Sequence, residues 1–286
     1  QDLAFLIAQT GYTPLLSMSW GFDLMQDVQV SSDAAGKARF ALRHSTRLIT
    51  DAHCSATQAV RLGFDQEKIC IFPWGVDLTH FSPSVARARG TIWRERQAWD
   101  GKRVLLCLRS WEPNYGVDVL LRAFAEAAKK DDDLRLILLG DGSQREHLLR
   151  ILQDADLNDK VFLGGRVPNQ DLITYYGAAD LYVTPSHVDG SSVSLMEAMA
   201  CGVPSVASDI PANLEWVAEG QTGWLFPDGD SDALAELLLR VSSFNLGAVG
   251  RRAREFAERH ADWQQNKQQL FLCWEKALNP SKGRYL

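Results

Sequence analysis

The sequence lacks several patterns that mark well-defined chemistries. No apolar run is long enough to span a membrane, no signal peptide is visible, and no repeat or low-complexity tract is present. A P-loop, an HExxH pair and a supported Ser/His/Asp or Cys/His constellation are also missing, which argues against P-loop nucleotidases, zinc proteases and triad hydrolases.

Cysteine is scarce, and positive charge does not dominate. Five cysteines occur in 286 residues and form no CxxC pair, so we expect reduced core thiols and a cytoplasmic protein. The net charge of −6 argues against broad nucleic-acid binding, although not against a local phosphate pocket. The cysteines are Cys54, Cys70, Cys107, Cys201 and Cys273.

Length and pattern predict an α/β fold with two domains. Apolar runs that are typical of buried parallel strands alternate with helical patterns through residues 84–262, which predicts a doubly wound parallel sheet. Residues 1–83 contain only three legible strands, so we expect the second half of a similar domain, joined by a C-terminal helix over 263–286. We also expect this N-terminal domain to be incomplete, with residues missing upstream of Gln1.

The stretch from Pro185 to Pro204 organises the rest of the chain. An apolar run precedes this stretch. Within it, a Gly-Ser-Ser loop comes first, and residues 192–201 then favour a helix that Gly202 ends. This strand, loop and helix unit directs backbone N–H groups and a helix dipole at an anion. Asp189 in the loop and Glu197 in the helix should place their carboxylates on the order of 10 Å apart. A nucleotide sugar, with hydroxyls at both ends and phosphates between, suits such a site.

This stretch resembles the family-4, or group 1, retaining glycosyltransferases of the GT-B fold, which carry two acidic residues separated by seven others. The resemblance implies that Glu197 binds the ribose and Asp189 the transferred sugar. The first acid of the family is usually Glu, so Asp189 has a shorter reach. The alternative is an unrelated doubly wound fold with two incidental acids. The resemblance also assigns the distal phosphate and sugar to the backbone amides of Gly190, Ser191, Ser192 and Val193.

Further expected donor contacts follow the strands of the second domain. The family has an Arg and, six residues later, a Lys on the diphosphate; here Arg109 matches, and Tyr115 stands in the place of the Lys. Tyr can donate one hydrogen bond but neutralises no charge. Gly140 is expected to border the nucleotide, and Arg166 and Val167 to line the base pocket. A plain surface position for Arg166 remains open.

Three other features are interpreted as structural and not as parts of the site. Trp20 occupies the place of a family His that faces the sugar, and we favour a packing role for it. His187 is expected only to line the loop. The acidic run at residues 131–133 is interpreted as a solvated turn between a helix and a strand, not as a metal site.

The resemblance implies a retaining transferase that moves a hexose from a UDP-, GDP- or other nucleotide-diphosphate sugar to a hydroxyl on a glycan or lipid-linked acceptor. It implies no metal or other cofactor. We expect a cytoplasmic location, either free or at the inner face of the membrane through the missing N-terminal half. Two alternatives remain: a nucleotide-sugar-binding protein without turnover, and a GT-B phosphorylase or epimerase.

Overall fold

The computed structural model describes residues 2–241 and 243–279. The chain divides into two compact units. Unit 1 contains Gln1–Gly75, Val188–Ser192 and Ala261–Leu286, and unit 2 contains Val76–His187 and Val193–His260.

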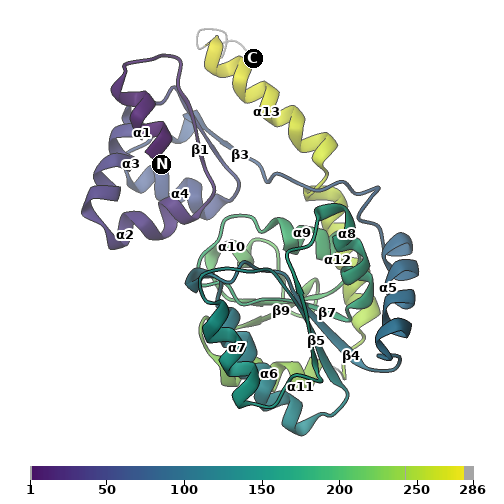
Figure 1. Cartoon of the computed structure of the whole chain (residues 1–286). Helices are drawn as coiled ribbons and strands as arrows, with labels where there is room; N and C mark the ends of the chain where they lie inside the picture. The colour runs from purple at the N-terminus through teal and green to yellow at the C-terminus, as the bar shows by residue number, and fades with distance from the viewer. Residues whose placement is uncertain (1, 242, 280–286) are drawn as a thin grey trace. The chain divides into compact units, whose positions relative to one another are not determined.

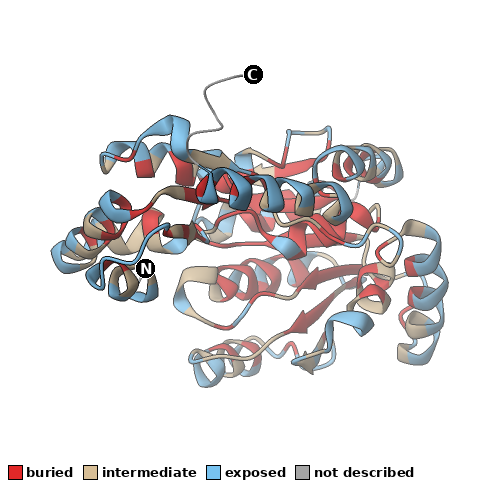
Figure 2. Cartoon of the chain, turned by 90° about the horizontal axis from the view of Figure 1, so that it is seen from above, coloured by how far each residue is buried: buried red, intermediate tan, exposed pale blue. Residues whose placement is uncertain are grey.

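Unit 2 is built on a six-stranded parallel sheet in the order β6-β5-β4-β7-β8-β9. This is the Rossmann order, and it reverses direction between β4 and β7, the point at which such sheets bind ligands. Figure 2 shows the strands of this sheet largely in the red of buried residues, as their apolar runs predict. The strands are β4 (Arg103–Cys107), β5 (Leu134–Leu139), β6 (Val161–Gly165), β7 (Leu181–Thr184), β8 (Ser205–Ser208) and β9 (Gly223–Phe226).

Helices cover both faces of this sheet (Figure 1). One layer packs α6 against α7 and α11, and the other packs α5 against α8 and α9 against α12. The helices are α5 (Pro83–Gln97), α6 (Val117–Lys130), α7 (Arg145–Asp154), α8 (Asn169–Ala178), α9 (Val193–Ala200), α10 (Pro211–Leu214), α11 (Ser231–Val241) and α12 (Leu246–His260), with a 3-10 turn, η3, at Pro113–Tyr115.

Unit 1 has a smaller parallel sheet in the order β1-β2-β3. The strands are β1 (Leu16–Ser19), β2 (Arg47–Thr50) and β3 (Ile69–Ile71). The helices are α1 (Asp2–Gln9), the π-helical η1 (Asp23–Asp27), α2 (Val28–Val30), α3 (Ser32–His44), α4 (His53–Arg61), the 3-10 turn η2 (Gln66–Lys68) and α13 (Trp263–Leu278).

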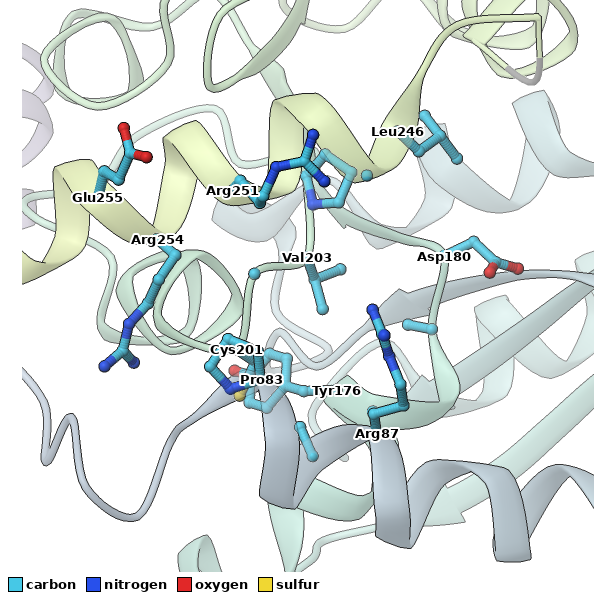
Figure 3. Close-up of a pocket in the computed structure, with 16 residues that line it drawn as sticks. Pro83, Arg87, Tyr176, Asp180, Cys201, Val203, Leu246, Arg251, Arg254 and Glu255 are labelled. Carbon is cyan, nitrogen blue, oxygen red and sulfur yellow. The ribbon is translucent and has the colours of Figure 1, made fainter.

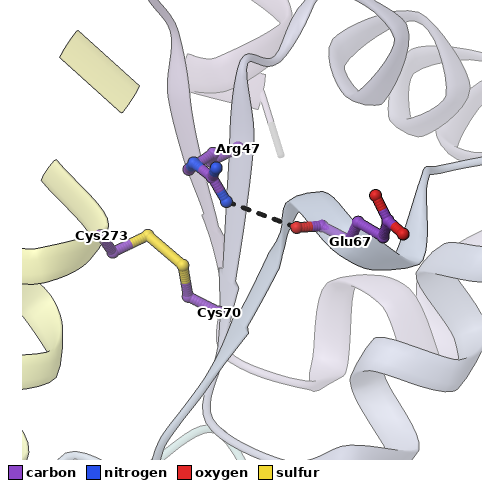
Figure 4. The surroundings of a disulfide bond; sticks show 4 residues. All are labelled: Arg47, Glu67, Cys70 and Cys273. Atoms are coloured by element: carbon purple, nitrogen blue, oxygen red, sulfur yellow. Dashed lines mark hydrogen bonds between the residues drawn. A yellow bond between two sulfur atoms is a disulfide. The ribbon is translucent and has the colours of Figure 1, made fainter. Parts of the chain in front are cut away.

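A disulfide joins Cys70 on β3 to Cys273 on α13 (Figure 4). The expectation that all cysteines are reduced core thiols is therefore wrong for this pair. The two residues are 203 positions apart in the sequence, and the packing of α13 beside the small sheet brings their Cα atoms within 6.4 Å. The bond fixes the C-terminal helix to the sheet of unit 1. Residues 280–286 of the expected helix lie outside the described residues.

The first division between the units falls after Gly75, earlier than the predicted boundary after residue 83. Contacts within unit 2 explain the difference. Phe81 packs edge-on against Tyr176 with 5.9 Å between ring centroids, and Arg254 donates to the carbonyls of Leu78 and Phe81. The predicted boundaries also assign residues 188–192 to the second domain, whereas the structure groups this loop with unit 1.

Among the described residues, no single helix has the length and apolar character of a membrane span. The bent pair α11 and α12 passes that test together, by length and composition only.

Candidate functional site

Three loops meet at the carboxyl edge of the unit 2 sheet, beside the point where the strand order reverses. The loop after β4 contains Arg109, and the loop after β5 begins at Gly140. A Cβ atom on Gly140 would lie 2.5 Å from the carbonyl oxygen of Arg109, and the φ of Gly140 is +114°. Glycine is therefore required here for a close approach between two loops. The Gly140 N–H donates to the carbonyl of Gly165 at the end of β6.

Arg109 is buried at this edge, with 8% of its surface exposed. Its Nη1 donates to the Ser194 hydroxyl over 3.2 Å, and its guanidinium carbon lies 4.3 Å from the centre of the Tyr115 ring. The cation is thus held against an aromatic face and the first turn of α9. A fixed guanidinium beside a helix N-terminus favours an anionic ligand.

Tyr115 closes the short turn η3 and packs against the main core of unit 2. The following residue, Gly116, has a φ of +58°, and a Cβ there would meet the carbonyl oxygen of Pro185. The turn therefore holds the Tyr115 ring next to Arg109. The contact of Tyr115 with a phosphate stays a prediction.

Glu197 lies inside α9 and is 3% exposed. Its Oε1 accepts a hydrogen bond from Asn169 Nδ2, and its Oε2 accepts one from the Tyr176 hydroxyl, both over 2.8 Å. Burial raises the pKa of Glu197 above its ordinary value, and these two bonds act against that rise. Each oxygen keeps a further lone pair, so the carboxylate can accept ribose hydroxyls as well. The ribose contact itself stays a prediction.

The sequence alone does not reveal the residues that contact Arg109 and Glu197. Ser194 precedes Glu197 by three positions and therefore shares its helix face, which is a signal that the helical period carries. The Ser194 hydroxyl lies 2.6 Å from the Tyr182 hydroxyl. The Ser194 carbonyl accepts a hydrogen bond from the Tyr176 hydroxyl over 3.0 Å. Tyr176, Tyr182 and Asn169 come from elements distant in the sequence, and no local pattern identifies them.

The loop with Asp189 belongs to unit 1 and is described there. Asp189 Oδ1 accepts from the N–H of Gly190 over 3.0 Å, and Asp51 Oδ2 accepts from the N–H of Ser191 over 3.0 Å. Two of the amides assigned to phosphate therefore donate to carboxylates of the protein. Ser191 and Ser192 are buried, and Val193 is 39% exposed. The phosphate and sugar roles of these residues stay predictions.

Several weaker assignments have clear surroundings. Arg166 is exposed after β6, next to the half-buried Val167. The pKa values of Glu112 and Asp141 lie below their ordinary range chiefly because Glu112 accepts hydrogen bonds from Ser143 and Asp141 accepts one from the Gly142 N–H, and the charge of Arg166 adds a smaller effect. His187 Nδ1 lies 2.6 Å from Asp228 Oδ1, so it binds a neighbouring turn as well as lining the loop.

The interpretation of residues 131–133 as a solvated turn fits the structure. Asp132 and Asp133 pair with Lys160 and Lys102 over 2.8 and 2.6 Å, and Asp131 pairs with Arg103.

The packing role favoured for Trp20 is wrong in part. Its ring lies 5.2 Å from that of Trp74, centroid to centroid, but 63% of the residue is exposed. A residue that follows the end of a strand has few neighbours to cover it, so the Trp20 ring stacks on Trp74 with one face and leaves its other face exposed.

A large cavity of unit 2, about 580 Å³, lies at the opposite, amino edge of the sheet (Figure 3). Its lining includes Asp180 just before β7 and Val203 before β8, together with Arg87 and Arg251 on the flanking helices. None of the predicted site residues lines it. Both arginines are exposed, which is ordinary for surface side chains, so this cavity does not compete with the carboxyl edge as the candidate site.

Comparison with known proteins gives a family match that covers most of unit 2. Residues 91–266 match the family described as "Glycosyl transferases group 1". The chain is 31% identical over 201 residues to a GDP-mannose-dependent alpha-(1-6)-phosphatidylinositol monomannoside mannosyltransferase of Mycolicibacterium smegmatis, covering 67% of this chain and 52% of that protein. It is 30% identical to the putative colanic acid biosynthesis glycosyltransferase WcaL of Escherichia coli, over 69% of this chain and 48% of that protein. The chain thus spans about half the length of these curated relatives.

The crystal structure of Anabaena HepE in complex with UDP-glucose is similar in fold. The TM-score is 0.84 at 21% identity, and the match covers 96% of this chain and 76% of that one. This likeness, with the parallel sheets of both units, confirms the predicted GT-B fold class.

Proposed function

This chain belongs to the group 1 glycosyltransferases, and on that premise we propose that it transfers a hexose, with retention, from a nucleotide-diphosphate sugar to a hydroxyl acceptor. The observation that carries the proposal is that a buried cation, Arg109, and a buried carboxylate, Glu197, both lie at α9 beside the switch point of the unit 2 sheet. Arg109 donates to the Ser194 hydroxyl, and the Tyr176 hydroxyl donates to Glu197 and lies within hydrogen-bond distance of the Ser194 carbonyl. Arg109 suits phosphate and Glu197 suits hydroxyls.

The roles follow from the charges. Arg109 and the first turn of α9 stabilise the negative charge that grows on the departing diphosphate. Glu197 accepts hydrogen bonds from the ribose. Asp189, through the resemblance, orients the transferred sugar. Gly140, Arg166 and Val167 lie at the ends of the neighbouring strands, where the nucleoside would bind.

Donor and acceptor are proposals drawn from relatives. Two facts guide the choice of donor: the mannosyltransferase relative is named as GDP-mannose-dependent, and HepE was solved with UDP-glucose. We propose a glycan or lipid-linked hydroxyl as acceptor, because one relative is named for a phosphatidylinositol mannoside and another for colanic acid biosynthesis.

The test is release of nucleoside diphosphate from GDP-mannose and, separately, UDP-glucose, with and without glycan and glycolipid acceptors. Transfer with an α-linked product, read from the anomeric signal in NMR, supports retention; a β-linked product excludes it. Turnover that is unchanged by EDTA supports the proposed independence of metal.

One observation favours the alternative of a binding protein without turnover. Tyr115 adds no charge beside Arg109, so under the proposed function the loop between β4 and α6 would offer the diphosphate one guanidinium and no second cation. Binding of a nucleotide sugar without hydrolysis or transfer over a full acceptor panel would favour this alternative. A cytoplasmic location stays a proposal, and the disulfide removes the argument from reduced thiols on which it rested.

A further inference from the structure

Asp51, which lies outside the sequence motifs described above, holds the loop that carries Asp189. It follows β2 directly and is 5% exposed. Its Oδ2 accepts from the Ser191 N–H over 3.0 Å, and its backbone carbonyl accepts from the Ser191 hydroxyl. Both contacts lie within unit 1 and join residues 140 positions apart.

The fit around Gly190 is equally close. A Cβ on Gly190 would lie 2.5 Å from Asp51 Oδ2 and 2.7 Å from the carbonyl oxygen of Trp20. A Cβ on Gly21 would lie 2.5 Å from the Gly190 nitrogen, and Gly21 has a φ of +93°. The loop is therefore clamped between the Asp51 carboxylate and the Trp20–Gly21 turn, with only glycine possible at the two closest points.

The charge on Asp51 is costly in this setting. The charged groups that act most on its pKa are the carboxylates of Asp189 and Asp23. Burial, then these two like charges, raises the pKa of Asp51 to about 7, although the Ser191 N–H opposes the rise. Its Oδ1 has no hydrogen-bond partner among the described residues. An amide side chain could accept from Ser191 without this cost, so fold stability alone does not explain a carboxylate here.

We propose that Asp51 is a positioning residue, whose carboxylate fixes the Asp189–Ser192 loop through the Ser191 amide. The inference rests on the proposed function for its purpose, because that function assigns the loop to the transferred sugar. The contact strengthens when Asp51 is ionised, since a charged acceptor binds an N–H more strongly than a neutral one.

Amide hydrogen exchange at Ser191, measured by NMR in the full chain, tests the positioning directly. We expect exchange about tenfold faster or more in Asp51→Ala, and an intermediate rate in Asp51→Asn, at pH 8. The matched control is Asp65→Asn, because Asp65 also accepts a backbone N–H over 3.0 Å in unit 1 but is exposed. Equal Ser191 exchange in Asp51→Ala and the wild-type protein overturns the inference.

Stability and turnover separate positioning from simple packing. Asp51→Asn removes a buried charge, so its melting temperature at pH 8 should equal or exceed that of the wild type, while release of nucleotide from GDP-mannose or UDP-glucose falls. The wild-type kcat/KM should rise through pH 7, and that of Asp51→Asn should stay flat. A variant that melts lower at pH 8 and keeps the wild-type pH profile contradicts the inference. Absence of turnover in the wild type counts against the proposed function, and the exchange measurement still decides the role of Asp51.

Discussion

Glu197→Gln probes the candidate site with the least disturbance to the fold. The side chain keeps its shape, and the hydrogen bonds around it can rearrange. The amide oxygen can accept from Asn169, the amide nitrogen can donate to the Tyr176 oxygen, and the Tyr176 proton can turn to the Ser194 carbonyl, which lies 3.0 Å away. No buried polar atom then loses its partner.

The expected loss is in ligand affinity. A carboxylate that accepts ribose hydroxyls makes charge-assisted bonds, and their replacement by neutral ones costs about 2 kcal/mol, or roughly thirtyfold in Kd. Stability should change in the opposite direction. Folding raises the pKa of Glu197 from 4.5, so its contribution to the free energy of unfolding falls as pH rises through the folded value. Glu197→Gln lacks this loss, so its stability relative to the wild type should be higher at pH 8 than at pH 4.

Titration calorimetry with GDP and UDP, together with melting curves at both pH values, measures the two effects. Glu126→Gln is the matched control, since Glu126 is exposed on α6 and pairs with the neighbouring Lys129. Nucleotide affinity equal to the wild type in Glu197→Gln would refute the ribose assignment.

Three further predictions follow from the same contacts. Tyr115→Phe keeps the ring against Arg109 and should cost about 1 kcal/mol or less in donor kcat/KM. Tyr115→Leu removes the cation–π contact and should lower donor kcat/KM further. Equal kcat/KM values for the two variants would show that the ring does not matter. Cys70→Ser should lower the unfolding free energy by about 2–4 kcal/mol, measured by denaturant titration beside Cys54→Ser, and equal losses would contradict a stabilising disulfide. Gly140→Ala should weaken nucleotide binding at least about tenfold, because its Cβ would displace the loop that holds Arg109; unchanged binding in calorimetry would show that the two loops are independent of the ligand.

Strong local patterns determined most of the fold. The alternation of strands and helices predicted for residues 84–262 is observed, because elements such as β5 and α6 are continuous apolar or amphipathic runs with clear ends. The helices η1 and α2 after Trp20 have no counterpart among the predicted elements, because the mixed sequence of this segment has no regular period and a π-helix has no simple sequence signature.

The site was predictable where the chemistry is local. Arg109 and Tyr115 lie in the same loop between β4 and α6, six positions apart, and their side chains meet in the structure. The pairing of Cys70 with Cys273 and of Asp51 with Ser191 depends on tertiary packing across 203 and 140 positions, which no local pattern contains. The two partners of Glu197, the exposed Asn169 and the buried Tyr176, both lie on α8, and no local pattern links them to a residue of α9.

The central claim is that the carboxyl edge of the unit 2 sheet binds a nucleoside diphosphate through Arg109. Calorimetric titration of GDP and of UDP into the wild type and Arg109→Ala, with melting curves to verify folding, tests it most directly. The account predicts saturable one-to-one binding of at least one nucleotide to the wild type, and binding at least about tenfold weaker in the folded variant. Equal affinity in both proteins, or no binding of either nucleotide to the wild type, would contradict it.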